Sequence, residues 1–222
     1  MNFMQLIQSL DDLLYELMSW LIFFPLTLWR TITRPLEMMA YAGRELRELP
    51  EKQFREALSP PLFLLLALLV SHALELSVNG STNLILADNR GLARFVDSDT
   101  KLLLLRLAIF SIIPLLLATI VARVSKSKLS DETLKAPFYE QCYPAAPFAL
   151  AIGIGTLLLH RGTVSAALGI AIMLAALIAY LAVQIVWFRR QLGCGIFRAG
   201  LLAGCAMIGG LLFTFLIGIL LI

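Results

Sequence analysis

Residues 102–122 read LLLLRLAIFSIIPLLLATIVA, and Arg106 is the one charged residue in this stretch. A helix needs about 20 consecutive apolar residues to cross a hydrocarbon core about 30 Å thick. This stretch has that length, and four other stretches resemble it. They are residues 62–78, 143–159, 164–188 and 199–222. The sequence therefore predicts an all-α, polytopic transmembrane bundle of five spanning helices.

The amino-acid composition excludes an ordinary soluble domain. Hydrophobic residues make up 59% of the 222-residue chain, and charged residues make up only 15%. Soluble domains carry charge on roughly a quarter of their residues. Within the five apolar stretches only Glu75 and Arg106 are charged, so nearly all of the charge lies elsewhere. We divide the chain into an N-terminal segment, residues 1–60, and a transmembrane domain, residues 61–222.

Lysine and arginine are distributed unevenly between the two sides of the predicted bundle. Residues 30–60, 123–142 and 189–198 hold six, four and three of them, whereas the opposite loops hold three and one. Loops rich in positive charge stay on the cytoplasmic side of a membrane. The N-terminal segment is therefore predicted to be cytoplasmic and the C-terminus to lie outside, and the short loops favour a bacterial cytoplasmic (inner) membrane. The net charge of +3 is an orientation signal and does not indicate nucleic-acid binding.

The first 29 residues contain no lysine or arginine, so they lack the positive region of a cleaved signal peptide. Their apolar residues recur at helical spacing, whereas Asp11, Asp12 and Glu16 lie on the other face. We expect an amphipathic helix at the membrane interface. Because helices that bind anionic lipid carry basic polar faces, this acidic helix is expected to pack on its own bundle or on a partner. A second, cytoplasmic helix is predicted between Pro35 and Pro50.

The end of the first helix leaves an alternative open. Residues 13–29 include a strongly apolar run that ends in Trp29 and Arg30, as a membrane boundary does. A sixth span with its N-terminus outside would also satisfy the charge count. Glu16 and Pro25 would make such a span short and interrupted.

Ionisable groups inside the membrane indicate where function lies, because a charge at mid-bilayer costs at least about 2.5 kcal/mol. Glu75 lies near the outer end of the first span and Arg106 near the outer start of the second, so the two side chains can pair. His72 lies one turn below Glu75 on the same helix face. His72, Glu75 and Arg106 are therefore the candidate binding residues.

Two interpretations of these three residues remain. In the first, His72 and Glu75 exchange a proton and Arg106 binds a carboxylate or a headgroup phosphate. In the second, Glu75 and Arg106 form a structural ion pair near the membrane interface. Transporters usually contain internal repeats or broken helices around a midplane site, and the sequence contains no convincing repeat.

Small residues recur every four positions in the last three predicted spans. Such stripes allow helix backbones to approach closely, which lipid-embedded helices need because lipid provides no hydrophobic drive. We expect close packing within the bundle, and a homodimer interface is the alternative. The predicted packing positions are Gly153, Ala171, Ala175, Gly200, Gly204 and Gly210.

The residues predict no enzyme, no cofactor and no metal site. His72 and His160 are the two histidines, and they cannot converge with a cysteine pair at metal-site spacing. The three cysteines, Cys142, Cys194 and Cys205, lie in the predicted inner half of the bundle and are expected to stay reduced. Phosphate-binding loops and nucleophile motifs are missing from the sequence.

The third predicted span begins at residues 138–148, FYEQCYPAAPF. Together with the cytoplasmic N-terminal segment and five spans with an outward C-terminus, this stretch resembles the bacterial branch of the Yip1-like membrane proteins. Tyr143 and Pro144 are the positions carried over, and the resemblance covers about residues 55–222. It implies a non-enzymatic membrane adaptor. The acidic, tyrosine-containing cytoplasmic motif of the eukaryotic members is not visible, so a GTPase-binding role is not implied.

Two functional hypotheses follow. The first is a membrane scaffold or accessory subunit that lies among membrane lipids and binds a protein partner through residues 1–60. Pairing of the small-residue stripes between chains would make it a homo-oligomer. The alternative is a small transporter or lipid-handling permease that uses His72, Glu75 and Arg106.

Overall fold

The computed structural model describes residues 3–79, 99–124, 130–159 and 161–221, and these ranges are helical with no strand. The predicted all-α fold is confirmed. The helices are α1 (Phe3–Thr33), α2 (Pro35–Glu45), the short 3-10 helix η1 (Pro50–Lys52), α3 (Pro60–Asn79), α5 (Asp99–Val124), α6 (Asp131–Leu159), α7 (Thr163–Leu192) and α8 (Ile196–Leu221).

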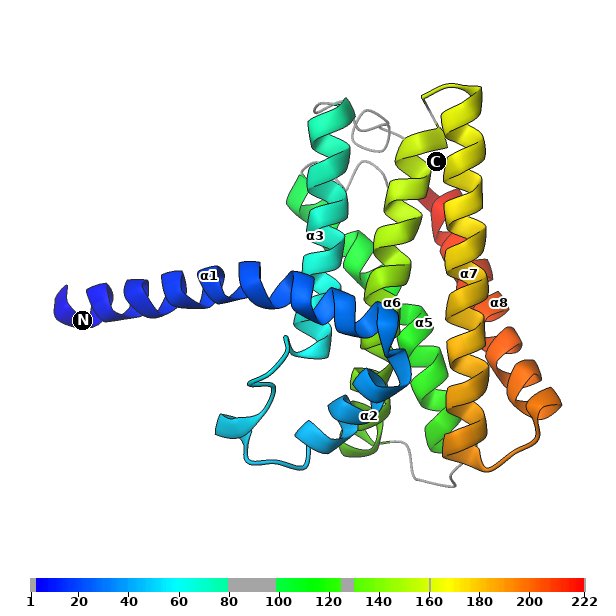
Figure 1. Cartoon of the computed structure of the whole chain (residues 1–222), viewed down its shortest axis with the longest axis horizontal. Helices are drawn as coiled ribbons and strands as arrows, with labels where there is room; N and C mark the ends of the chain where they lie inside the picture. Colours follow the sequence, from blue (N-terminus) through cyan, green and yellow to red (C-terminus); the bar gives the residue numbers. More distant parts are fainter. Residues whose placement is uncertain (1–2, 80–98, 125–129, 160, 222) are drawn as a thin grey trace.

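Five helices, α3, α5, α6, α7 and α8, are long and apolar enough to cross a membrane, and each coincides with a predicted span. Figure 1 shows them as one bundle in which α6 lies between α3 and α7. The α7 helix ends where Gly193 adopts a left-handed backbone with φ of 58°, a conformation that glycine adopts without steric cost. The polytopic five-helix architecture is therefore as predicted.

The α6 helix begins earlier than the apolar run from residue 143 indicates. The backbone N–H of Thr133 donates to Ser130 Oγ at 3.3 Å, and the backbone N–H of Ser130 donates to Thr133 Oγ1 at 3.0 Å. These reciprocal bonds satisfy amide groups that a helix start leaves without an intrahelical partner. Glu140 and Gln141 consequently belong to a spanning helix and not to a loop.

The α1 helix is continuous through Pro25 and runs across the bundle, roughly perpendicular to the spanning helices (Figure 1). It is not one of the helices that are long and apolar enough to span a membrane among the described residues. The five candidate spans therefore do not include residues 13–29. The C-terminal half of α1 packs on the bundle, where Thr27 and Thr31 are fully buried.

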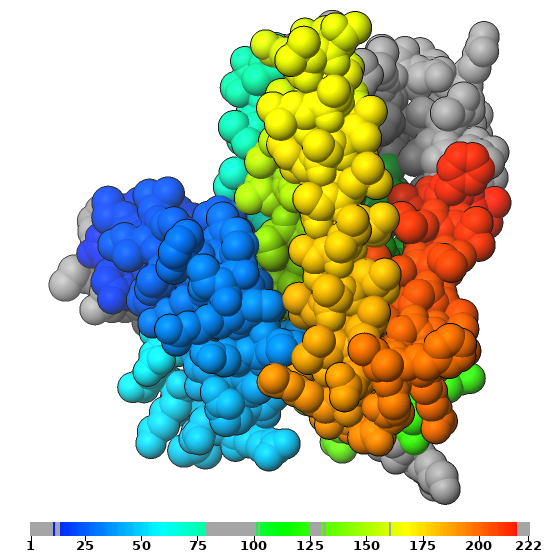
Figure 2. All heavy atoms as spheres, turned by 45° about the vertical axis from the view of Figure 1, so that its right-hand side comes forward, coloured from blue at the N-terminus to red at the C-terminus, as the bar shows by residue number. Residues whose placement is uncertain are grey.

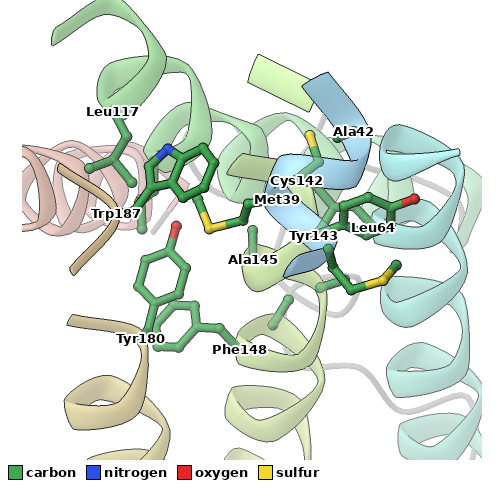
Figure 3. Packing of buried hydrophobic residues seen from close by; sticks show 14 of the residues in the cluster. Met39, Ala42, Leu64, Leu117, Cys142, Tyr143, Ala145, Phe148, Tyr180 and Trp187 are labelled. Carbon is green, nitrogen blue, oxygen red and sulfur yellow. The ribbon is translucent and has the colours of Figure 1, made fainter. Parts of the chain in front are cut away.

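The core is centred on the first half of α6. Cys142, Tyr143 and Ala145 are buried there, and Figure 3 shows them among side chains from α2, α3 and α7. Phe148 of α6 stacks on Tyr180 of α7, with ring centroids 4.8 Å apart. Both faces of this part of α6 are therefore occupied, one by the N-terminal segment and one by α7.

The second half of α6 approaches its neighbours through glycine. A Cβ atom added at Gly169 of α7 would lie 2.6 Å from the carbonyl oxygen of Gly155 in α6. A Cβ atom at Gly153 would overlap the side chain of Ser71 in α3, and one at Gly210 of α8 would lie 2.5 Å from Ile113 Cγ1 in α5. These contacts are the backbone approaches that small residues permit in lipid.

The six predicted packing positions divide into two groups. Gly153 and Gly210 lie at close helix contacts, and a Cβ atom at Gly200 would lie 3.8 Å from Ile185. Ala171 and Ala175 are exposed, and no atom lies within 4 Å of a Cβ added at Gly204. The structure therefore shows no close contact within the bundle at Ala171 and Ala175, and none on the Cβ side of Gly204. Ala171 and Ala175 lie on an exposed face of α7, and Figure 2 shows α7 as an outer helix between the α1 and α2 region and α8.

Candidate functional site

The three candidate binding residues meet in the structure. Arg106 Nη2 lies 2.5 Å from Glu75 Oε2, and Arg106 Nη1 lies 3.5 Å from His72 Nδ1. The guanidinium group is always a donor, so it donates to the carboxylate and to the imidazole nitrogen together. His72 Nδ1 is 4.0 Å from Glu75 Oε2, and the His72 side chain is only 7% exposed. Arg106 is therefore the centre of the cluster and links α5 to α3.

The pair is only partly shielded from its surroundings. The side chains of Glu75 and Arg106 are 28% and 22% exposed. An Arg–carboxylate pair with this separation is a strong, charge-assisted hydrogen bond. Each group offsets the cost of placing the other in the membrane.

A cavity of about 190 Å³ adjoins the ion pair between α3, α5 and α6. Ser71 and Thr156 add hydroxyl groups to its wall, and Phe110 and Ile152 add apolar surface. One water molecule occupies about 30 Å³ of liquid, so the cavity has room for several waters or for one small solute. Gly153 also lines this cavity, and its missing side chain leaves the space that Ser71 occupies.

A second concentration of polar groups lies at the opposite end of the bundle, beside α2. We call this the α2 end. Glu140 of α6 is 8% exposed, and Gln191 Nε2 of α7 donates to its Oε2 at 3.5 Å. A Cβ atom added at Gly43 of α2 would lie 2.5 Å from Glu140 Oε1, so α2 packs directly on this carboxylate.

Sequence reasoning missed Glu140 because it assigned residues 123–142 to a loop. The signal was nonetheless present, since Glu140 lies between aromatic residues, Tyr139 on one side and Tyr143 on the other. Tyr143 is fully buried and donates from its hydroxyl group to the Leu58 carbonyl oxygen at 2.9 Å. Residues 138–148 are therefore the part of α6 on which the N-terminal segment packs.

Aromatic rings tie that segment to α6. The Tyr41 ring of α2 lies 6.4 Å from the Tyr143 ring, and the Phe54 ring lies 6.1 Å from the Tyr139 ring. Ring pairs at these distances stabilise a contact beyond the area they bury. Phe54 adopts a left-handed φ of 55°, and its backbone N–H donates to Glu45 Oε2 at 2.6 Å. A non-glycine residue persists in that conformation only where its surroundings hold it, so this connection is rigidly placed.

The remaining candidate residues are dispersed. Cys142 is buried, Cys194 is half-buried and Cys205 is exposed, and all three are free thiols. His160 lies outside the described residues. The described residues bring no group of three potential metal ligands together. Comparison with protein families, with curated proteins and with solved structures finds no match for this chain.

Proposed function

We propose that the protein is a non-enzymatic membrane scaffold or accessory subunit that binds a protein partner through the first half of α1. We call residues 3–18 the α1 arm. The observation that carries the proposal is the position of this arm, which extends sideways from the bundle and ends far from the other helices (Figure 1). A long helix with few contacts to its own protein is available to another.

The described side chains of the arm are exposed and mostly apolar. Tyr15 is 76% exposed and Met18 66% exposed, and Leu14 and Leu17 are also exposed. An exposed apolar helix face that extends beyond the bundle suits helix-in-groove recognition, in which such a face binds in a hydrophobic groove of a partner. A partner helix or a membrane-embedded groove would cover these side chains.

The base of the arm is fixed to the bundle. The backbone N–H of Leu58 donates to Thr27 Oγ1 at 3.2 Å, and the Phe24 ring packs 5.6 Å from the Phe63 ring of α3. Thr27 is completely buried. An arm that is held at its base keeps a defined direction, so binding to it costs less conformational entropy than binding to a flexible segment.

The charge of the arm favours a protein over the lipid surface. Asp11 and Glu16 are exposed, and residues 1–29 contain no lysine or arginine. The anionic headgroups of a cytoplasmic leaflet repel such a face. We place the α2 end on the cytoplasmic side of a bacterial inner membrane, because the arginines of the N-terminal segment gather there. The partner is then expected to present lysine or arginine to Asp11 and Glu16.

Site-specific photo-crosslinking in native membranes tests the proposal. A photoreactive residue replaces Tyr15 in one variant and Phe197 in a control variant. Phe197 is an aromatic residue at the start of α8 and is 86% exposed. We expect Tyr15 to give one dominant cross-linked protein, which is lost in an Asp11→Asn, Glu16→Asn double variant, and Phe197 not to give it. The same products from both positions would contradict the proposal.

Removal of the arm complements this experiment. Deletion of residues 1–18 takes away the exposed half of α1 and retains Trp20, Phe23 and the buried threonines that pack on the core. We expect a folded bundle that no longer retains the partner during purification. A partner that co-purifies equally well with the truncated protein would show that the arm does not bind it.

A small transporter or permease is the second candidate function, and the cavity beside Glu75 and Arg106 is the observation that favours it. In that case Glu75→Gln should stop uptake of a small anion or of protons in a protein that remains folded. If the charge-swapped double variant Glu75→Arg, Arg106→Glu is fully active, the pair is structural and the transport hypothesis fails.

A further inference from the structure

The bend between α1 and α2 forms an open pocket, which we call the elbow pocket. Its volume is about 620 Å³, and its walls come from the end of α1, from α2 and from Glu56 of the following connection. Three arginines line it: Arg30 from α1, Arg34 from the junction of the helices, and Arg44 from α2. The bend between two consecutive helices thus brings three guanidinium groups to one pocket.

Of the three arginines of the elbow pocket, only Arg34 forms an ion pair among the described residues, and that pair is exposed. Arg30 Nη1 donates to the backbone carbonyl of Glu56 at 3.1 Å, which orients the guanidinium group but leaves its charge in place. Arg34 pairs with Glu37 at 3.6 Å, and both side chains are 71% exposed. Within the part of the chain that the structure describes, no carboxylate lies within 4.0 Å of the Arg44 guanidinium.

The polar groups between the arginines suit an anion with several oxygen atoms. Burial and the nearby Glu45 carboxylate raise the pKa of Tyr41 to about 12, so its hydroxyl group remains a donor at neutral pH. Guanidinium groups bind phosphate oxygens through two parallel N–H bonds. Glu37 and Glu56 also line the pocket, so the three arginines leave an excess of one positive charge.

The elbow pocket lies where the apolar surface of α1 gives way to charge. Trp29 lines the pocket and is 67% exposed, and Leu21 and Ile22, two turns earlier, are 77% and 69% exposed. Tryptophan is enriched at the headgroup level of membranes, and arginine extends its charged end toward that level. The mouth of the pocket is therefore expected to lie at the level of the lipid headgroups along α1.

We propose that the elbow pocket binds the phosphate group of an anionic membrane phospholipid, with Arg34 and Arg44 as its main ligands and Arg30 as an oriented third donor. The phosphodiester lies between the helices and the acyl chains lie along the exposed apolar face of α1. Free inorganic phosphate presents the same chemistry, and the experiment separates the two sources. The site is independent of any protein partner of the α1 arm.

Native mass spectrometry of the full-length protein in detergent tests the proposal. The probes are dioctanoyl phosphatidylglycerol, dioctanoyl phosphatidylcholine and inorganic phosphate. We expect phosphatidylglycerol to bind in preference to phosphatidylcholine. An Arg34→Gln, Arg44→Gln variant should bind phosphatidylglycerol about tenfold more weakly, since it loses two charge-assisted contacts. Arg30 is left unchanged because it also holds the Glu56 carbonyl.

The matched control is Arg189→Gln, Arg190→Gln, which removes two exposed arginines from the last turn of α7. This control should bind the lipid as the wild type does. In the opposite direction, Glu37→Gln releases Arg34 from its ion pair and should strengthen binding a few-fold. An equal loss in both double variants, or no loss in the Arg34 and Arg44 variant, would overturn the proposal.

Competition identifies the source of the phosphate group. Inorganic phosphate is added to wild-type protein that carries bound phosphatidylglycerol or, as a control, phosphatidylcholine. If phosphate displaces phosphatidylglycerol but not phosphatidylcholine, the pocket accepts a soluble phosphate. If phosphate does not displace phosphatidylglycerol, the ligand is the lipid. Either result supports a phosphate site. A protein without residues 1–18 should retain this binding, so failure of the arm as a partner site and failure of the elbow pocket give different results.

Discussion

The two ends of the bundle bury polar groups in different ways. Away from α2, Glu75 and Arg106 form an ion pair beside a cavity, and glycines bring α6 close to α3 and α7. At the α2 end, Glu140 is more deeply buried, yet its described hydrogen-bond partner is the neutral amide of Gln191. One end therefore depends on charge neutralisation and backbone contact, and the other on the packing of rings and of the N-terminal segment.

This difference teaches which polar groups are independent of the N-terminal segment. The ion pair joins two spanning helices and is complete without α1 or α2. Glu140 packs against Gly43 of α2, and Tyr143 bonds to Leu58 in the connection that follows η1. The polar groups of the α2 end therefore contact the N-terminal segment, whereas the ion pair of the other end joins α3 to α5.

The largest effect is expected at the glycine contact between α6 and α7. Gly169→Ala places a methyl group against the backbone oxygen of Gly155, which cannot move aside as a side chain can. We expect a loss of about 3 kcal/mol of stability, at the upper end for overpacking, measured by SDS-induced unfolding in mixed micelles. Gly204→Ala is the matched control, because the added methyl group meets nothing within 4 Å. Equal losses of stability in Gly169→Ala and Gly204→Ala would contradict the importance of the backbone contact.

The ion pair should give the next largest effect. Arg106→Gln leaves Glu75 in the membrane without its cation, and we expect a loss of about 2 kcal/mol, less than for a fully buried pair because both side chains are partly exposed. The same unfolding assay measures it. Recovery of most of that loss in Glu75→Arg, Arg106→Glu would show that the opposite charges matter and not the individual side chains. An unchanged stability in Arg106→Gln would contradict the comparison of the two ends.

The smallest effect is expected from Glu140→Gln. No lysine or arginine of the described residues lies within 4.0 Å of the Glu140 carboxylate, and an amide at this position still reaches Gln191. We expect a change below about 1 kcal/mol in either direction, because a desolvated charge and a weak charged hydrogen bond are lost together. A loss as large as that of Arg106→Gln would mean that both ends depend on charge pairing.

The location of the spans and of the ion pair could be predicted from local hydropathy. Five long apolar runs are sufficient to predict five helices, because a lipid environment requires each spanning segment to satisfy its own backbone. Glu75 and Arg106 are conspicuous as the only charges in those runs, and the short separation of their helices brings them together. Glu140 is not conspicuous in this way, because it lies among other charged residues of the predicted loop.

The faces of the helices could not be predicted in the same way. In lipid, a face that packs on a neighbour and a face that contacts acyl chains are equally apolar, so the sequence pattern does not distinguish Gly169 from Ala171. The structure buries the first against Gly155 and exposes the second. The elbow pocket was equally invisible, because Arg30, Arg34 and Arg44 counted in the sequence only as an orientation signal.

The sequence by itself determined that this is a helical membrane protein with five spans, where the spans lie, and which two charges enter them. Transfer of apolar surface and backbone hydrogen bonding decide these properties segment by segment. Only the tertiary structure decided that α1 runs across the bundle, that α2 packs on Glu140, and that three arginines share a pocket. These features depend on contacts between segments distant along the chain, and no local pattern encodes which of several apolar faces will meet.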